Sequence, residues 1–350
     1  MPAVQVTPSS APFKVLVTGA NGYVAMWTVR TLLERGYAVR GTVRAAQKGE
    51  YLVRYFEKYG DRFELAIVPD ITGEGAFDEA VAGVDAILHM ASPVRLDAED
   101  PQELIQPALQ GTLGALTSAL KYGKSVKRVV LTSSVGSIFR ESDKPIVLSE
   151  ADWNDADPLA VEKEGAAAKP TSKYRASKVL AERSAWDFVE KHAQEISWDL
   201  AVINPPLPAI QELNAPSDLN FSALEWYKSI TTPDMGGKPK EVVLCRRSCW
   251  VDVRDVAEAH VRALEVEAAG GKRFIINAGS LCMQEFLDTA NALNTSGRAL
   301  PVGFPDAEKE HPPHLLCDAS RSKDILGLKY RTVEETTRDT LADYDARGWA

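Results

Sequence analysis

The sequence predicts an α/β protein with a doubly wound parallel sheet and a smaller C-terminal α/β lobe, and three observations support this class. Short apolar runs rich in β-branched residues alternate with helix-compatible segments from about residue 14 to residue 134, which is the order of repeated βαβ units. The first of these runs, Val15–Val17, passes through a glycine turn directly into a helix. After about residue 206 the alternation is lost, and a segment rich in proline, glycine and aromatic residues follows.

The composition and charge of the chain argue against several classes of protein. Its 350 residues, 45% of them hydrophobic, suffice for one large domain with an appended lobe. The 40 Lys and Arg residues are outnumbered by 49 Asp and Glu, and the net charge of −9 disfavours nucleic acid as a partner. Residues 1–12 lack the apolar core of a secretory signal, and no apolar run is long enough to span a bilayer. We therefore expect a soluble, cytoplasmic protein with no membrane partner.

The four cysteines predict reduced thiols rather than a disulfide or metal framework. Cys245 and Cys249 are four residues apart, but no Cys or His pair at zinc-ligand spacing follows them. Cys282 and Cys317 stand singly in the sequence. We expect no metal site.

The turn after the first strand is the first signal for a ligand. Gly19 permits a tight turn, Gly22 lets the backbone approach a pyrophosphate, and Ala25 lets the helix pack close to the strand. The helix has one apolar face and ends at Gly36, and its positive N-terminal end would face phosphates. A tight turn without any ligand is the alternative interpretation. The residues expected to bind a dinucleotide here are Gly19, Asn21, Gly22, Tyr23 and Val24.

The second predicted strand, Tyr37–Arg44, indicates which dinucleotide is bound. In dinucleotide-binding folds, an acid at the end of this strand binds the 2′-OH of NAD, whereas arginine accommodates the 2′-phosphate of NADP. Here the strand ends at Arg44, and Lys48 follows with no acid between them. We therefore expect NADP(H) as the cofactor, with two solvated surface cations as the alternative interpretation.

The next elements continue the alternation and add cofactor contacts. Residues 47–62 are compatible with a helix, and Phe63–Asp70 form a third strand, with Asp70 and Ile71 expected near the adenine. A helix begins at residues 77–81, and Val84–Ser92 form a fourth strand. His89 lies within that apolar run, which favours a core histidine over a catalytic one. The loop residues expected along the cofactor are Ala91, Ser92 and Pro93.

The fifth strand and the helix beyond it carry the groups suited to catalysis. A helix over 107–122 precedes the strand 126–134, which ends at Ser134, on the edge where open α/β sheets place their sites. A long amphipathic helix then carries Tyr174 and Lys178 one turn apart. A lysine cation at that distance favours the phenolate and lowers the pKa of tyrosine, and a serine hydroxyl can bind a substrate oxygen. Hydride would come from a nicotinamide. An exposed helix pair is the alternative interpretation of Tyr174 and Lys178.

Together these motifs resemble an extended short-chain dehydrogenase/reductase with a Rossmann-type fold. Within that superfamily the chain resembles the dihydroflavonol-reductase-like branch, particularly fungal NADPH-dependent aldehyde and ketone reductases. The matching segments are Thr18–Ala25, Arg40–Arg44, Leu131–Ser134, Tyr174–Lys178, Trp250–Ala257 and Ile325–Leu328.

The resemblance implies a role for each matched residue. Ser134 would be the catalytic serine, Tyr174 the general acid, and Lys178 would hold the nicotinamide ribose and lower the Tyr174 pKa. Pro205 would lie closest to the nicotinamide. Two departures stand out: the segment Leu207–Ile210 is shorter than in related chains, and Gly114 replaces a frequent asparagine.

The C-terminal part is expected to select the substrate. We assign residues 13–206 to the dinucleotide-binding domain and 207–350 mainly to a substrate-binding lobe, with segments such as 250–266 returning to the first domain. A partly helical cap over 214–237 carries Phe221, Trp226 and Tyr227, which either line the pocket or pack as core. Further elements expected in this lobe are a strand at 273–276, a helix at 283–293, and a last helix with a Thr332–Glu335 capping box.

The function expected from the sequence is NADPH-dependent reduction of an aldehyde or ketone to an alcohol by hydride transfer, with Tyr174 as proton donor. The partner is a small carbonyl compound, and the chain is expected to be a monomer or homodimer. The alternatives are a nucleotide-sugar epimerase or dehydratase of the same superfamily, and a non-catalytic NADP(H)-binding protein.

Overall fold

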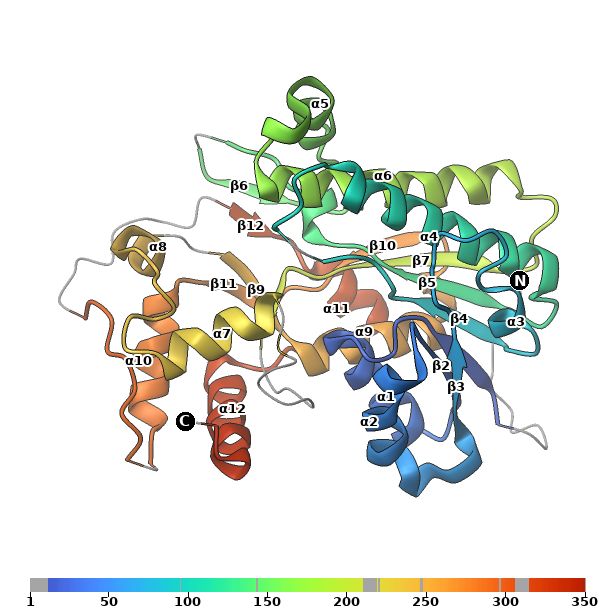
Figure 1. Cartoon of the computed structure of the whole chain (residues 1–350). Helices are drawn as coiled ribbons and strands as arrows, with labels where there is room; N and C mark the ends of the chain where they lie inside the picture. Colours follow the sequence, from blue (N-terminus) through green and yellow to red (C-terminus); the bar gives the residue numbers. More distant parts are fainter. Residues whose placement is uncertain are drawn as a thin grey trace.

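Seven parallel strands form the central sheet, in the order β10-β7-β5-β4-β1-β2-β3 (Figure 1). The computed structural model describes residues 12–94, 96–142, 144–209, 219, 221–245, 248–295, 297–305 and 315–349. The strands are β1 (Lys14–Val17), β2 (Ala38–Val43), β3 (Phe63–Ile67), β4 (Ala86–His89), β5 (Arg128–Thr132), β7 (Asp199–Asn204) and β10 (Lys272–Ile275). The middle residues of β1, β4, β5 and β7 are apolar and buried, which suits central strands of a sheet covered on both faces, whereas the edge strand β3 is only partly buried.

Helices cover both faces of this sheet, which confirms the doubly wound α/β fold. On one face lie α1 (Tyr23–Glu34), α2 (Ala46–Phe56) and α9 (Val253–Glu265), whose apolar residues share one core cluster with the sheet. On the other lie α3 (Asp78–Val81), α4 (Gln102–Tyr122) and α6 (Pro170–Lys191). The strand order reverses between β1 and β4, and ligands of such sheets bind at the carboxyl ends of the strands beside this point.

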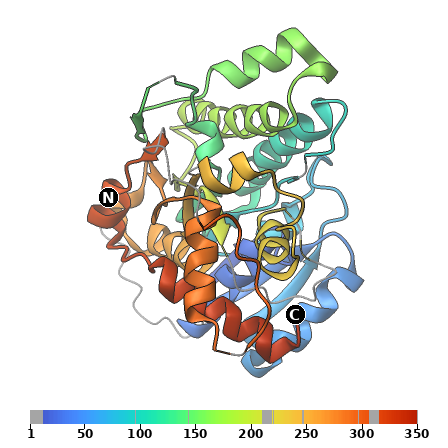
Figure 2. The same cartoon turned by 90° about the vertical axis from the view of Figure 1, so that its left-hand side faces the viewer.

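The remaining elements form a smaller part beside those carboxyl ends (Figures 1 and 2). Two small sheets have the orders β11-β9-β8 and β12-β6. The strands are β6 (Ile146–Leu148), β8 (Leu207–Ala209), β9 (Ser248–Asp252), β11 (Gly279–Leu281) and β12 (Leu315–Cys317). The helices are α5 (Ala156–Glu164), α7 (Phe221–Thr231), α8 (Lys240–Cys245), α10 (Met283–Leu293), α11 (Ser320–Leu326) and α12 (Val333–Arg347).

Two expectations about these elements were wrong. Helix α4 begins at Gln102, so Pro107 lies inside the helix rather than at its start. Strand β10 was expected in the smaller lobe, but it pairs with β7 at the edge of the central sheet. Phe274 and Ile275 are fully buried there. Strand β10 pairs in parallel with the outer edge of β7, and the local sequence pattern of β10 does not predict this pairing.

Other expectations agree with the structure. Helix α1 ends just before Gly36, whose φ of 92° is one that glycine adopts readily. Thr332 and Glu335 form the predicted capping box at the start of α12. The cap predicted over 214–237 is partly helical as expected, because α7 occupies Phe221–Thr231, although residues 210–218 and 220 lie outside the described part of the chain. Within the described residues, no helix has the length and apolar character required to cross a bilayer.

Candidate functional site

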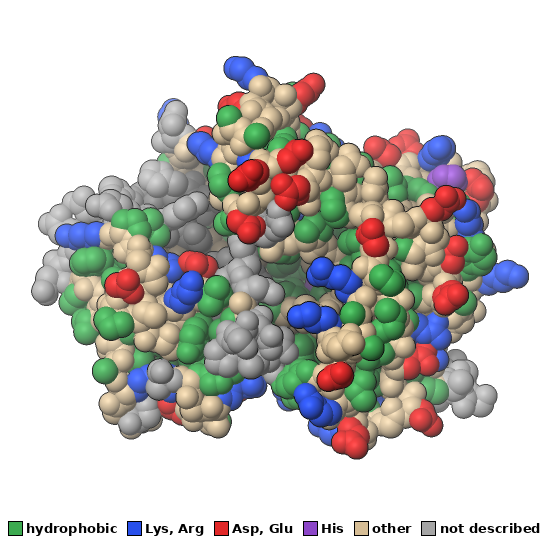
Figure 3. Space-filling model, viewed as in Figure 1, with side chains coloured by type: hydrophobic (Ala, Val, Ile, Leu, Met, Phe, Trp, Pro, Cys, Tyr) green, Lys and Arg blue, Asp and Glu red, His purple; other side chains and the backbone are tan. Residues whose placement is uncertain are grey.

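A cavity of about 1160 Å³ lies at the carboxyl ends of the central strands, and Figure 3 shows the surface hollowed near the centre of its view. All but one of the site residues predicted from the sequence line this cavity. Those lining it are Gly19, Asn21, Gly22, Tyr23, Val24, Arg44, Asp70, Ile71, Ala91, Ser92, Pro93, Ser134, Tyr174, Lys178 and Pro205. The exception is Lys48, which is exposed on α2 and does not line the cavity.

The glycine turn after β1 has the geometry that glycine alone accommodates. Gly19 has a φ of 66°, and a Cβ there would lie 3.0 Å from the Cα of Ala91. The end of β2 holds the turn in place, since Gly19 N donates to Thr42 Oγ1 at 3.0 Å and Ala20 N to Thr42 O at 2.8 Å. Gly22 is the N-cap of α1, so no side chain caps the helix, and the first turn holds no acid. The first turn and positive end of α1 therefore lie at the cavity, as phosphate binding requires.

The loop after β4 is positioned by one buried hydroxyl. Thr18 Oγ1 accepts from Met90 N and Ala91 N, both at 3.0 Å, and lies 3.0 Å from His89 Nδ1. Because its acceptor sites face two N–H groups, the hydroxyl donates to His89 Nδ1, and the proton of this neutral ring is on Nε2. The pKa of His89 is lowered to about 3, mainly by burial and in addition by the charge of Lys178. His89 thus shapes the cofactor loop as a neutral core residue and lies outside the cavity lining.

The ends of β2 and β3 supply the groups expected around the adenosine. Arg44 is exposed at the end of β2 and lines the cavity. Asp70 accepts from Thr72 N and Thr72 Oγ1 at 2.8 and 2.7 Å, which lowers the pKa of its carboxyl. This bonding closes a tight turn that exposes Ile71 to the same cavity. With its glycine turn, bare helix end and terminal arginine, this half of the cavity fits a dinucleotide that carries a 2′-phosphate.

Ser134, Tyr174 and Lys178 meet in the other half of the cavity. Ser134 caps the short 3₁₀ helix η2 (Val135–Ser137), where its Oγ accepts from Gly136 N at 2.9 Å, and it also hydrogen-bonds to Tyr174. Lys178 Nζ lies 5.7 Å from the centre of the Tyr174 ring. The carbonyl of Pro205 accepts from Val135 N at 3.0 Å, which places Pro205 beside this group.

The ammonium of Lys178 is buried and available to a ligand. Burial lowers its pKa to about 8, so that it remains largely charged at neutral pH. Within the described residues, no hydrogen bond or ion pair satisfies this ammonium. A pair of ribose hydroxyls would supply the acceptors that the chain itself does not.

The electrostatics of Tyr174 differ from the expectation. We expected Lys178 to lower its pKa, but burial raises it overall, against the opposing effects of the Ser134 hydroxyl and the Arg175 charge. Desolvation of the phenolate therefore outweighs the nearby groups. A neutral, protonated Tyr174 at pH 7 is the form that can donate a proton.

Arg175 is a charge of the site that the sequence reading did not identify. Its guanidinium stands 3.6 Å from the centre of the Phe139 ring and 3.6 Å from Asp157 on α5. Arg175 and Phe139 both line the cavity. Through Phe139, the acid-rich segment 138–169 that precedes α6 contributes to the wall of the site. The adjacency of Arg175 to Tyr174 was the one signal for it in the sequence.

A buried polar cluster supports Ser134 from behind. Glu182 Oε2 accepts from Ser133 Oγ and Ser137 Oγ, both at 2.6 Å, and from Asn204 Nδ2 at 3.0 Å. Its Oε1 accepts from Arg273 Nε at 2.5 Å. Ser137 Oγ and Asn204 Nδ2 also donate to the Ser134 carbonyl, at 2.8 and 3.2 Å.

This cluster joins four elements beneath the site. Glu182 lies on the α6 face that carries Lys178 one turn earlier and Tyr174 two turns earlier. Arg273 comes from β10, and Trp153 stacks on its guanidinium at 3.8 Å. In the sequence, the indication for Glu182 is its spacing of four residues from Lys178, which places an acid on the buried face of the helix.

The smaller part of the molecule supplies an apolar wall to the cavity. Trp226 on α7 lines the cavity and also packs on Phe286, with ring centres 4.2 Å apart. Tyr227 packs against Tyr344 and Trp349, so the cap aromatics serve both as lining and as core. The other described apolar residues of the smaller part that line the cavity are Val242, Cys249, Trp250, Leu281, Cys282 and Met283.

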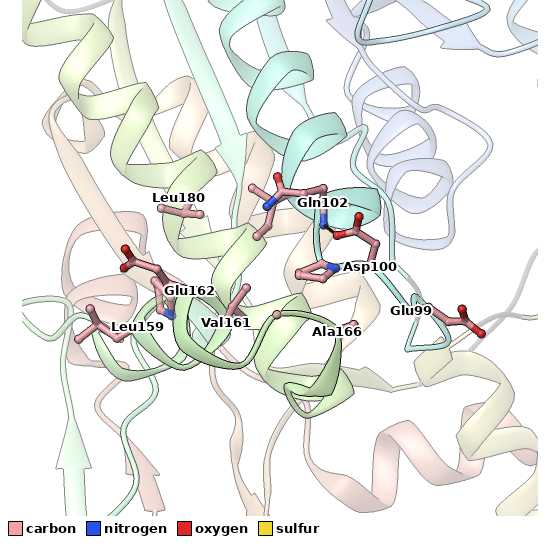
Figure 4. A pocket seen from close by; sticks show the side chains of 12 residues that line it. Glu99, Asp100, Gln102, Leu159, Val161, Glu162, Ala166 and Leu180 are labelled. Atoms are coloured by element: carbon pink, nitrogen blue, oxygen red, sulfur yellow. Dashed lines mark hydrogen bonds between the residues drawn. The ribbon is translucent and has the colours of Figure 1, made fainter.

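A second cavity, of about 800 Å³, lies among the start of α4, α5 and α6 (Figure 4). Its lining includes Ile105, Val161 and Leu180, together with acidic residues such as Glu99 and Glu162. None of the predicted site residues lines it. The functional candidate is therefore the larger cavity.

The chain is similar to known proteins over nearly its whole length. Residues 15–206 match the NAD dependent epimerase/dehydratase family. The chain is 35% identical over 338 residues to ketoreductase azaE of Aspergillus niger, covering 94% of this chain and 96% of that protein.

Two solved structures share the whole architecture. Yeast methylglyoxal/isovaleraldehyde reductase Gre2, complexed with NADPH, has a TM-score of 0.81 at 30% identity and covers 96% of this chain and 100% of its own. Vestitone reductase from alfalfa has a TM-score of 0.77 at 25% identity, with coverage of 96% and 99%. The likeness thus extends over the smaller part as well as the central sheet.

Proposed function

Since the chain belongs to the NAD dependent epimerase/dehydratase family, we propose that it is an NADPH-dependent reductase that converts an aldehyde or ketone to an alcohol. The observation that carries this proposal is the convergence of Ser134, Tyr174 and Lys178 in the cavity that also contains the glycine turn and Arg44. Relatives named as ketoreductase and as methylglyoxal reductase support the same reaction.

The residues of the chain divide the work of the reaction. The helix end at Gly22 and Tyr23 holds the pyrophosphate, Arg44 binds the 2′-phosphate, and Lys178 binds the ribose of the nicotinamide. NADPH, when bound, supplies the hydride that reduces the carbonyl carbon. Ser134 Oγ hydrogen-bonds to the carbonyl oxygen as negative charge develops there. Tyr174 Oη then gives its proton to that oxygen, which completes the alcohol.

The substrate side of the cavity favours an apolar carbonyl compound. The wall formed by Trp226, Val242 and Met283 offers contact area without charge. Among the described residues of the smaller part, the one cation that lines the cavity is Lys238, which pairs with Glu225 at 2.8 Å. A nucleoside diphosphate would require free basic groups in this region, so the wall favours an alkyl or aryl carbonyl.

The test is oxidation of NADPH by the purified chain in the presence of aldehydes, diketones, dihydroflavonols and UDP-sugars. We expect turnover with one or more carbonyl compounds and none with UDP-sugars. Cofactor binding without turnover across the carbonyl panel would favour a non-catalytic protein. As part of the proposal we keep a cytoplasmic location and a monomeric or homodimeric state, the second of which light scattering measures directly.

A further inference from the structure

Two cysteines face each other at the wall of the active-site cavity. Cys249 lies on β9 and Cys317 on β12, and their Sγ atoms are 3.0 Å apart although 68 residues separate them. Each is at most 7% exposed, and both are free thiols. Of the two, Cys249 lines the cavity.

We propose that Cys249 and Cys317 form a redox-sensitive pair, which a small hydroperoxide entering the active-site cavity converts to a disulfide. The Cys249 thiolate attacks the terminal oxygen of the hydroperoxide, the O–O bond breaks, and an alcohol or water leaves as Cys249 becomes a sulfenic acid. Cys317 sulfur then attacks that sulfur, the S–O bond breaks, and hydroxide leaves with the Cys317 proton as water. The two thiols are oxidised and the hydroperoxide is reduced.

The surroundings assign different roles to the two sulfurs. The hydrogen bond with Cys317 lowers the pKa of Cys249, which favours Cys249 over Cys317 as the attacking group. That same bond raises the pKa of Cys317, and burial and the Glu150 carboxylate raise it further. Cys317 therefore keeps the proton that the second step needs.

The backbone around the pair is held, so the sulfurs cannot drift apart. Strand β12 pairs with β6, and Asn277 Nδ2 donates to the Cys317 carbonyl at 3.0 Å. Val135, Leu148 and Ile275 belong to the same apolar cluster as the two cysteines. Because a disulfide needs an S–S distance of about 2.05 Å, the sulfurs must approach by only about 1 Å. Because Cys249 lines the cavity, an oxidant that enters the cavity can reach the pair.

The disulfide would crosslink β9, at the wall of the cavity, to β12. It closes a loop of 68 residues, a length at which a crosslink strongly restricts the unfolded chain. We therefore expect the oxidised protein to have a higher Tm than the reduced one. This inference concerns thiol chemistry and does not depend on the proposed carbonyl reduction.

The experiment treats the folded, full-length chain with hydrogen peroxide and follows thiols and mass. We expect the loss of two alkylatable thiols, a peptide crosslink between Cys249 and Cys317, reversal by dithiothreitol, and a higher Tm before reversal. Cys282 also lines the cavity, so Cys282→Ser is the matched control and should still form the crosslink.

Variants of the pair separate the two steps. Cys317→Ser should stop at a Cys249 sulfenic acid that dimedone traps, and Cys249→Ser should form neither product. If the wild-type protein under peroxide keeps all its thiols, or crosslinks other cysteines, the proposal is overturned. Peptide mapping of the wild type needs no variant and decides the matter even if a variant fails to fold.

Discussion

At the scale of single residues, the site works through groups whose surroundings alter their ordinary chemistry. Burial raises the Tyr174 pKa and lowers the Lys178 pKa to about 8. Tyr174 therefore keeps its proton at neutral pH, and Lys178 is a cation with no hydrogen-bond partner among the described residues. The hydrogen bond between Tyr174 and Ser134 places both hydroxyls where one carbonyl oxygen can meet them.

Replacing Tyr174 with phenylalanine tests the proton donor. Tyr174→Phe removes the phenol and leaves the ring in place, so turnover should fall by about 100-fold or more. Binding of NADPH, measured by titration of its fluorescence, should change little. The matched control is Tyr122→Phe, since Tyr122 is exposed at the end of α4, and this variant should keep full activity. Wild-type turnover in Tyr174→Phe would remove the phenol from the mechanism.

Replacing Arg44 tests the cofactor preference. A charge-assisted hydrogen bond to phosphate contributes about 1.5–3 kcal/mol, so Arg44→Ala should weaken NADPH binding by about 10- to 100-fold. Binding of NADH, which lacks the 2′-phosphate, should hardly change. Lys48→Ala is the companion variant, and we expect a smaller effect because Lys48 does not line the cavity. Equal weakening of NADPH and NADH in Arg44→Ala would contradict the assignment.

At the scale of elements, helix α6 sets the relative positions of the groups that we propose to be catalytic. One face of this helix carries Tyr174, Lys178 and Glu182 in successive turns. Glu182 fastens that face to the ends of β5 and β7 through Ser133 and Asn204, and Arg273 balances its charge from β10. The cluster therefore fixes the position of α6 along the sheet, and with it the approach of Tyr174 to Ser134.

Removing Glu182 should affect both stability and catalysis. Glu182→Ala leaves the Arg273 guanidinium buried without its carboxylate, and breaking such a pair costs about 3–5 kcal/mol of unfolding free energy. In the folded fraction, kcat should fall more than the affinity for NADPH, because the cluster supports Ser134 and lies behind the cavity. Urea unfolding and single-turnover kinetics measure the two effects.

The control for this variant lies on the same helix. Glu190 is exposed near the end of α6, so Glu190→Ala should change the unfolding free energy by no more than about 0.5 kcal/mol. If Glu182→Ala unfolds at the urea concentration of the wild type, the cluster does not stabilise the fold as we infer.

At the scale of the whole molecule, two buried histidines connect stability to pH. Burial lowers the pKa of His89 to about 3 and that of His260 to about 4, from an ordinary 6.5. His260 Nδ1 donates to the Val256 carbonyl and its Nε2 accepts from Thr132 Oγ1, each at 2.7 Å, so the folded state needs the neutral ring. The unfolded chain binds protons on both residues below pH 6.5, whereas the folded chain does not until well below that.

The protein should therefore lose stability as the pH falls from 6.5 towards 4. At about 1.4 kcal/mol per pH unit, each histidine accounts for roughly 3 kcal/mol over this range. Asp255 opposes this loss because burial raises its pKa to about 6, so its contribution grows as the pH falls. The informative measurement is thus the difference in urea unfolding between the wild type and His260→Gln at several pH values. The variant should show a shallower loss, whereas the exposed-site control His192→Gln should follow the wild type.

The sequence by itself determined the alternation of strands and helices through β5, the glycine turn, Arg44, and the spacing of Tyr174 and Lys178 on one helix. Each of these depends on spacing within one strand, turn or helix, where periodicity and backbone geometry act locally. Tertiary structure alone decided that β10 joins the central sheet, that Arg175 opposes the rise of the Tyr174 pKa, and that Lys48 lies outside the cavity.

The same holds for the pairs that link distant parts of the chain. Glu182 meets Arg273 across 91 residues and Cys249 meets Cys317 across 68, and no spacing in the sequence announces either contact. Such contacts depend on the order of the strands in the sheet and on where each helix packs against a face of the sheet. This arrangement is determined by the burial of apolar area over the whole molecule, which cannot be read from any single stretch of sequence.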